Sequence, residues 1–163
     1  MQDKMQIAKI EIITFGIVCA VMLMLGIDAM LVGIYDGCRW HQHLTYQFFH
    51  ANIFHLAANL YVMWLCVTRF KLSQRQMLMC FIISAMVPAT LPMPTIGASG
   101  IVYAMLGIIN TMVVEKFRFA MWIAVYIAIS ALFNCNWSIH LCCYALGFMS
   151  NSIILLWTRL TRL

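Results

Sequence analysis

The fold is decided by a stretch that reads Gly97-Ala98-Ser99-Gly100-Ile101-Val102-Tyr103-Ala104-Met105-Leu106-Gly107 and continues as an apolar run to residue 114. Three prolines precede it, so we expect an irregular loop over 88–98 and a helix over 99–114. A helix of about 15 residues measures roughly 22 Å, less than the ~30 Å core of a bilayer. If its inner end lies at the membrane surface, Ser99 lies below the headgroups. Irregular backbone at that depth must line a wet cavity or be buried by protein.

The composition supports a membrane location for this helix. Of 163 residues, 64% are hydrophobic and 9% are charged, whereas roughly 25% are charged in an average soluble domain. A soluble fold of this size cannot bury that much apolar surface, and a bilayer is its natural solvent. No linker, low-complexity tract or internal repeat divides the chain, so we expect one domain over 1–163.

Six apolar segments predict an all-α, polytopic membrane protein built as a six-transmembrane-helix bundle. The first segment exceeds the length of a signal-peptide core, so we expect it to be a retained span. The predicted spans are about 10–34, 52–68, 76–91, 99–114, 119–133 and 138–158.

The basic residues predict the orientation of these spans. With six spans, nine of the ten Lys and Arg residues fall on one side and Arg39 falls on the other. The positive-inside rule makes the nine-residue side cytoplasmic, which places both termini there. The net charge of +5 is spread over four cytoplasmic segments. It therefore indicates topology and contact with anionic lipid rather than a nucleic-acid partner.

Several polar side chains lie in the outer half of the predicted bundle, where they are costly and are candidates for function. His55 and Asn59 are four residues apart and share a helix face just after His50. Simpler interpretations exist: hydrogen bonds between helices for these residues, a helix N-cap for Ser99 and an interfacial anchor for His140. The histidine spacing is not HExxH and the chain has no CxxC pair. We therefore expect no metal and no cofactor.

The faces of the fourth and sixth spans predict that Ser99 and His140 meet. Ser99, Tyr103 and Gly107 recur every four residues, and Gly107 would let another helix approach closely. Gly147 offers a matching small surface on the helix that carries His140. Histidine is the usual base that activates a serine nucleophile, so the pair is typical of acyl transfer.

A third, acidic member of this pair has no obvious source. Asp28 and Asp36 are the outward carboxylates, and they lie on or just after the first span. We therefore expect a Ser-His dyad with Tyr103 packed on the His140 ring. Acyl transfer also needs hydrogen-bond donors for the oxyanion. His50, Asn59 and the Ser99 backbone N–H are the candidates.

These residues resemble the rhomboid family of intramembrane serine proteases. The segment 97–107 is similar to the family's GxSGxxYxxxG fourth helix. The run Leu44-Thr45-Tyr46-Gln47-Phe48-Phe49-His50 and the HxxxxHxxxN spacing of His50, His55 and Asn59 resemble its second-helix entry. His140 with Gly147 resembles its sixth helix. The likeness extends from about Cys38 to the end of the chain.

The resemblance implies a hydrolase that cuts transmembrane protein substrates in or near the membrane, in a bacterial-type plasma membrane. It leaves the oligomeric state and the identity of the substrate open. By this resemblance Ser99 would be the nucleophile and His140 the base, His50 and Asn59 would stabilise the oxyanion, and His55, Tyr103 and Gly97 would support the site.

Departures from the family pattern keep an alternative open. Asn136, Ile139 and Cys143 stand where the family's sixth helix has small residues, which puts the close approach of the fourth and sixth helices in question. An inactive rhomboid-like protein that binds transmembrane clients is therefore the second hypothesis. A small transporter or channel is the third, and it is disfavoured because the polar residues occupy one half of the bilayer.

Overall fold

A computed structural model describes residues 2–88, 90, 92–132 and 135–161, with side chains described from residue 6. All regular elements among these residues are helices, and the connecting loops contain one isolated antiparallel bridge, between Ile34 and Thr95. The long helices are α1 (Gln2–Leu25), α4 (Ile53–Phe70), α5 (Gln74–Met86), α6 (Ser99–Met112), α7 (Lys116–Leu132) and α8 (Trp137–Leu160). The short helices are α2 (Ala29–Val32), α3 (Gln42–Thr45) and the 3₁₀ turn η1 (Tyr46–Phe48).

The predicted bounds of the first span, 10–34, are wrong. α1 ends at Leu25 because Gly26 adopts a left-handed conformation, with φ of +60°, that a helix cannot continue through. The Asp28 side chain then accepts the backbone N–H of Met30 at 2.9 Å and caps the short helix α2. The apolar run therefore continues past the turn but is no longer part of the same helix.

Local capping explains where three other helices begin. The Asn52 side chain accepts the His55 backbone N–H at 2.9 Å at the start of α4. Ser73 and Gln76 form a reciprocal capping box at the start of α5. At the start of α8, Asn136 accepts the Ile139 backbone N–H at 3.3 Å. Two of these caps directly precede the histidine-bearing turns of α4 and α8, so they fix the orientation of the site residues.

Helix α6 is the centre of the molecule. It contacts α4, α5, α7 and α8, and most of its residues are buried. Its closest neighbour is α8, and the two backbones meet at a pair of glycines. A Cβ on Gly107 would overlap the Tyr144 carbonyl oxygen, and one on Gly147 would overlap the Ala104 carbonyl oxygen. The packing predicted from these two glycines is therefore present in the structure.

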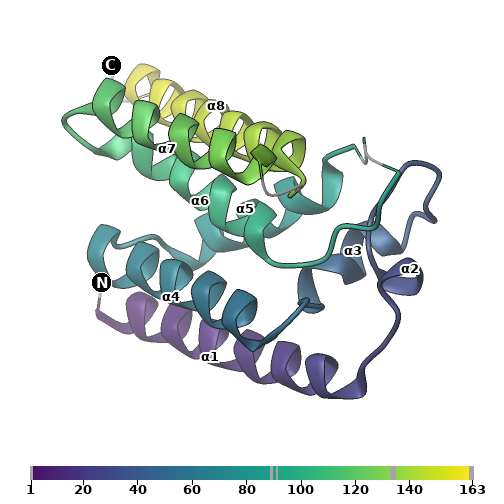
Figure 1. Cartoon of the computed structure of the whole chain (residues 1–163). Helices are drawn as coiled ribbons and strands as arrows, with labels where there is room; N and C mark the ends of the chain where they lie inside the picture. The colour runs from purple at the N-terminus through teal and green to yellow at the C-terminus, as the bar shows by residue number, and fades with distance from the viewer. Residues whose placement is uncertain (1, 89, 91, 133–134, 162–163) are drawn as a thin grey trace.

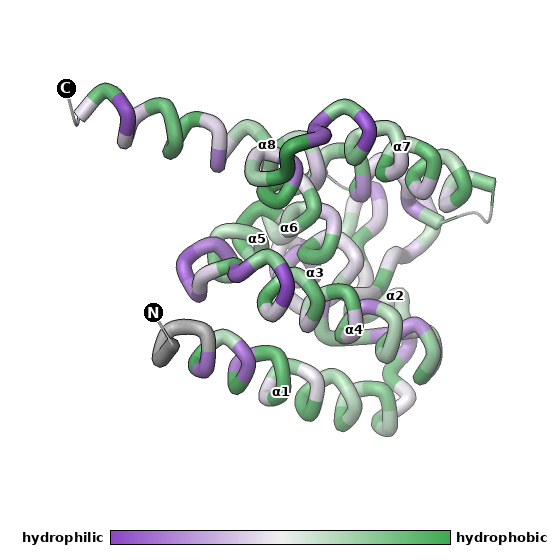
Figure 2. Tube along the Cα trace, turned by 90° about the vertical axis from the view of Figure 1, so that its left-hand side faces the viewer, coloured by the Kyte–Doolittle hydropathy of each residue, from purple (hydrophilic) through white to green (hydrophobic). Residues whose placement is uncertain are grey.

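The helices run roughly along one direction, with α1 beside α4 and α8 on the far side of α6 (Figure 1). α1 begins and α8 ends at the same end of the bundle, while α2 and α3 lie at the other (Figure 1). Figure 2 shows that apolar residues predominate along α1, and Ile17 and Met24 on this helix are 61% and 87% exposed. Large apolar side chains that face outward need a lipid environment.

Among the described residues, three helices are long and apolar enough to cross a membrane: residues 6–25 of α1, α4 and α8. α6 is apolar but shorter.

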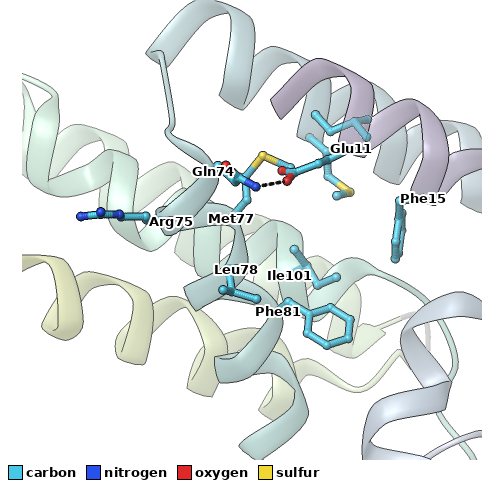
Figure 3. A pocket seen from close by; sticks show the side chains of 10 residues that line it. Glu11, Phe15, Gln74, Arg75, Met77, Leu78, Phe81 and Ile101 are labelled. Carbon is cyan, nitrogen blue, oxygen red and sulfur yellow. Dashed lines mark hydrogen bonds between the residues drawn. The ribbon is translucent and has the colours of Figure 1, made fainter. Parts of the chain in front are cut away.

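A cavity of about 290 Å³ lies between α1, α4, α5 and α6 (Figure 3). The Gln74 side-chain amide donates to the Glu11 carboxylate at 2.6 Å at its polar edge. The rest of its lining is largely apolar, with Phe15, Phe81 and Ile101 among the lining side chains. None of the site residues expected from the sequence lines it.

Gly147→Ala should destabilise the fold because its new Cβ would press on the α6 backbone. Overpacking of this kind costs roughly 1–3 kcal/mol in free energy of unfolding, measured by chemical unfolding in mixed micelles. Gly16→Ala is the matched control, since a Cβ there meets the flexible end of Leu60 at 3.0 Å. Equal stability of the two variants would show that the contact between α6 and α8 is not tight.

Candidate active site

The loop before α6 sets the position of Ser99. Gly97 has φ of +130°, a conformation that side chains other than hydrogen rarely allow. The His55 ring also lies against this glycine, so that a Cβ there would be 2.6 Å from His55 Cε1. Gly97 is thus required twice, once by the turn and once by the imidazole, and the chain then enters α6 at Ser99.

Ser99 and His140 meet across the interface between α6 and α8. His140 Nε2 lies 3.0 Å from Ser99 Oγ, within hydrogen-bond distance. The Tyr103 ring stacks on the His140 ring, with centroids 4.3 Å apart and an interplanar angle of 17°. A histidine held in this way can accept the hydroxyl proton of the serine.

The large residues Ile139 and Cys143 do not prevent this approach. Both are buried on α8, with 1% and 0% exposure. Cys143 is accommodated beside Gly100, since a Cβ on that glycine would lie 3.3 Å from the Cys143 Sγ. The 3.0 Å contact between Ser99 Oγ and His140 Nε2 therefore forms with both large residues in place.

The other ring nitrogen of His140 has a partner that the sequence reasoning missed. His140 Nδ1 lies 3.2 Å from Ser130 Oγ on α7. Asp28 caps α2 instead of approaching the histidine. The sequence carries one weak signal for Ser130, a polar residue near the outer end of the otherwise apolar run 119–133. Hydroxyls in such runs usually bond to their own helix, so the signal alone did not single it out.

His50 is buried, with 4% exposure, and the backbone N–H of Ala98 donates to its Nε2 at 3.2 Å. Burial, together with the neighbouring His55, lowers the pKa of His50 to about 4, so the ring is neutral at neutral pH. Its Nε2 therefore acts as an acceptor that holds the loop before Ser99.

Asn59 presents a buried donor beside the same cavity as Tyr103, the residue whose ring stacks on His140. Its Nδ2 is buried and has no hydrogen-bond partner among the described residues. An unsatisfied buried donor costs about 1–3 kcal/mol, so such a group is typical of a position that binds a ligand. Asn59 lines a cavity of about 460 Å³ between α4, α6 and α7, together with Tyr103 and Tyr126.

Further polar contacts hold the 88–98 loop to α8. The Asn136 side-chain amide donates to Thr95 Oγ1 at 3.0 Å, and the hydroxyls of Thr90 and Ser138 are 2.5 Å apart. Within the described part of the chain, no three His, Cys, Asp or Glu side chains are grouped as metal ligands would be.

A family model described as Rhomboid domain matches residues 37–157. The chain belongs to the rhomboid family. The matched range covers α3 to most of α8, and it includes each residue of the site described above. No curated protein and no solved structure matches the chain. The rhomboid domain and its outward-facing apolar helices make this an integral membrane protein.

Acidification should destabilise this rhomboid domain through His50. Because the folded-state pKa of about 4 lies below the ordinary value of 6.5, the unfolded chain binds the proton more tightly. Stability is then lost as pH falls below about 6.5. From pH 7 to pH 5 the loss should be roughly 1–2 kcal/mol, measured by unfolding in micelles. His50→Gln keeps an acceptor for the Ala98 N–H and should lose less stability over the same pH range. An equal loss in this variant would contradict the attribution of the pH dependence to His50.

Proposed function

We propose that this rhomboid domain is an intramembrane serine endopeptidase that hydrolyses peptide bonds in or near transmembrane segments of other membrane proteins. The observation that carries the proposal is the 3.0 Å contact between Ser99 Oγ and His140 Nε2. Tyr103, whose ring stacks on His140, lines a cavity together with Asn59, whose side-chain amide is an unpaired buried donor, and we propose that a reacting carbonyl group binds there.

The reaction follows from the roles of these atoms. Ser99 Oγ attacks the substrate carbonyl carbon while its proton passes to His140 Nε2. The imidazolium then returns that proton to the leaving amine, which leaves an ester on Ser99. A water molecule, deprotonated by the same nitrogen, hydrolyses the ester and restores the serine.

The geometry favours His55 over His50 as an oxyanion donor. The sequence predicts this role for His50, but the ring nitrogen that meets the loop before Ser99, Nε2, carries a lone pair and accepts the Ala98 N–H. The His55 ring lies against Gly97, and Gly97 is two residues before Ser99. On α4, His55 is also one helical turn before Asn59 and shares its face. We therefore assign the oxyanion site to His55, Asn59 and the Ser99 backbone N–H, and a loop-holding role to His50.

We propose that α1, α4, α5, α6, α7 and α8 are six membrane spans with both termini in the cytoplasm. The common end of α1 and α8 in Figure 1 and the distribution of basic residues support this topology. The cavity between α4, α6 and α7 reaches Asn59 and Tyr103, so a substrate helix would enter between α4 and α7. A bacterial-type plasma membrane is the compartment that we propose.

Cleavage of a generic transmembrane substrate in liposomes tests the activity. The natural chain should release product, and both Ser99→Ala and His140→Ala should abolish it because each removes one half of the proton transfer. Asp28→Ala and Asp36→Ala are the controls and should retain activity. A correctly folded natural chain that binds the substrate without cutting it would instead support the client-binding alternative.

Loss of an oxyanion donor should lower turnover. His55→Ala and Asn59→Ala should each reduce kcat by roughly 10–10³-fold, while His50→Gln should stay within a few-fold of the natural chain at neutral pH. The measurement is steady-state cleavage in liposomes, with folding checked by unfolding in micelles. If His50→Gln loses as much activity as Asn59→Ala, the original assignment of His50 to the oxyanion is the better one.

A further inference from the structure

The polar environment of the His140 ring comes from two different helices. Ser99 on α6 meets Nε2 at 3.0 Å, and Ser130 on α7 meets Nδ1 at 3.2 Å. The stacked Tyr103 ring covers one face of the imidazole. Among the described residues, these two hydroxyls are the hydrogen-bond partners of the ring nitrogens. Each ring nitrogen of His140 therefore faces one serine hydroxyl.

The direction of the contact with Ser130 follows from the number of its hydrogens. The Ser130 hydroxyl donates to the Ile127 carbonyl oxygen at 2.7 Å. A hydroxyl has one hydrogen and two lone pairs, and a carbonyl oxygen cannot donate. With its hydrogen on the Ile127 carbonyl, the Ser130 oxygen meets His140 as an acceptor, which places the imidazole hydrogen on His140 Nδ1.

This direction fixes the tautomer that serine activation needs. A neutral imidazole carries a hydrogen on one nitrogen and a lone pair on the other. With the hydrogen on Nδ1, the lone pair lies on Nε2 and faces Ser99. The opposite tautomer would place a hydrogen on Nε2 and would leave Ser99 without a base.

We propose that Ser130 is a positioning residue that holds His140 in this tautomer and orientation, a role that rests on the protease activity proposed above. During attack, the Ser99 proton moves to Nε2 as the bond from Ser99 Oγ to the carbonyl carbon forms. The resulting imidazolium donates its Nδ1 hydrogen to the Ser130 oxygen. Ser130 itself gains and loses no proton, and a neutral hydroxyl takes the place that a carboxylate occupies in a Ser-His-Asp triad.

The location of Ser130 on α7 gives this role a structural consequence. α7 packs against α6 and α8, and many of its apolar side chains face outward, such as Trp122, Val125 and Leu132. The serine, the histidine and the positioning hydroxyl thus come from three separate helices. Catalysis then requires α7 to be seated against α8 at the moment of proton transfer.

Two variants of equal shape separate the oxygen from the packing. Ser130→Thr keeps an acceptor oxygen that can bond back to its own helix, whereas Ser130→Val has the same branched shape without the oxygen. Ser152→Ala is the matched control, because Ser152 donates to the Phe148 carbonyl at 2.8 Å on an exposed face of α8 and touches no histidine. All are compared with the natural chain and with Ser99→Ala by kcat and KM for a transmembrane substrate in liposomes.

We expect Ser130→Val to lower kcat by roughly 10–100-fold with little change in KM, and Ser130→Thr and Ser152→Ala to remain within about threefold. Equal kcat for Ser130→Thr and Ser130→Val would overturn the positioning role, whether both are active or both are impaired. If the natural chain still cleaves the substrate and Ser99→Ala does not, the proposed protease function stands without the role of Ser130. If the natural chain cleaves no more than Ser99→Ala, both the protease function and the role of Ser130 are overturned.

Discussion

The structure depends on the contact between the backbones of α6 and α8. Gly107 on α6 and Gly147 on α8 let the two backbones approach so closely that neither position has room for a Cβ. In a bilayer, helix association has little hydrophobic driving force, so close packing of small residues is a main source of stability. The same contact sets the separation of Ser99 and His140, because each residue lies seven or eight positions before the glycine of its own helix.

Around this contact, the polar groups of the outer half form a connected scaffold. His50 holds the loop before Ser99 through the Ala98 N–H, and Asn136 ties the same loop to α8 through Thr95. Polar groups in a membrane protein need partners, and these contacts supply one each for His50 Nε2, the Asn136 amide and the Thr95 hydroxyl. Asn59 Nδ2 and the second ring nitrogen of His50, Nδ1, are both buried without a partner among the described residues. Asn59 also lines the cavity between α4, α6 and α7, which is why we propose this donor, and not His50, for contact with a substrate.

Much of this arrangement could be predicted from the sequence, since helical periodicity alone places Ser99, Tyr103 and Gly107 on one face. The meeting of Ser99 with His140 also follows from matched glycines on two helices. The end of α1 was missed because hydropathy does not register a turn at Gly26 inside an apolar run. Spacing likewise could not distinguish His50 from His55, since their roles depend on which ring reaches Gly97 and which accepts the Ala98 N–H. Ser130 was missed because its partner lies on another helix.

The central claim is that His140 makes Ser99 a nucleophile. Labelling with a fluorophosphonate, which reacts with activated serines, tests it without a protein substrate. The labelled residue is located by mass spectrometry in the natural chain and in His140→Ala. The account predicts modification at Ser99 in the natural chain and its loss in the variant. Equal labelling of Ser99 in both, or no labelling of Ser99 in a folded natural chain, would contradict it.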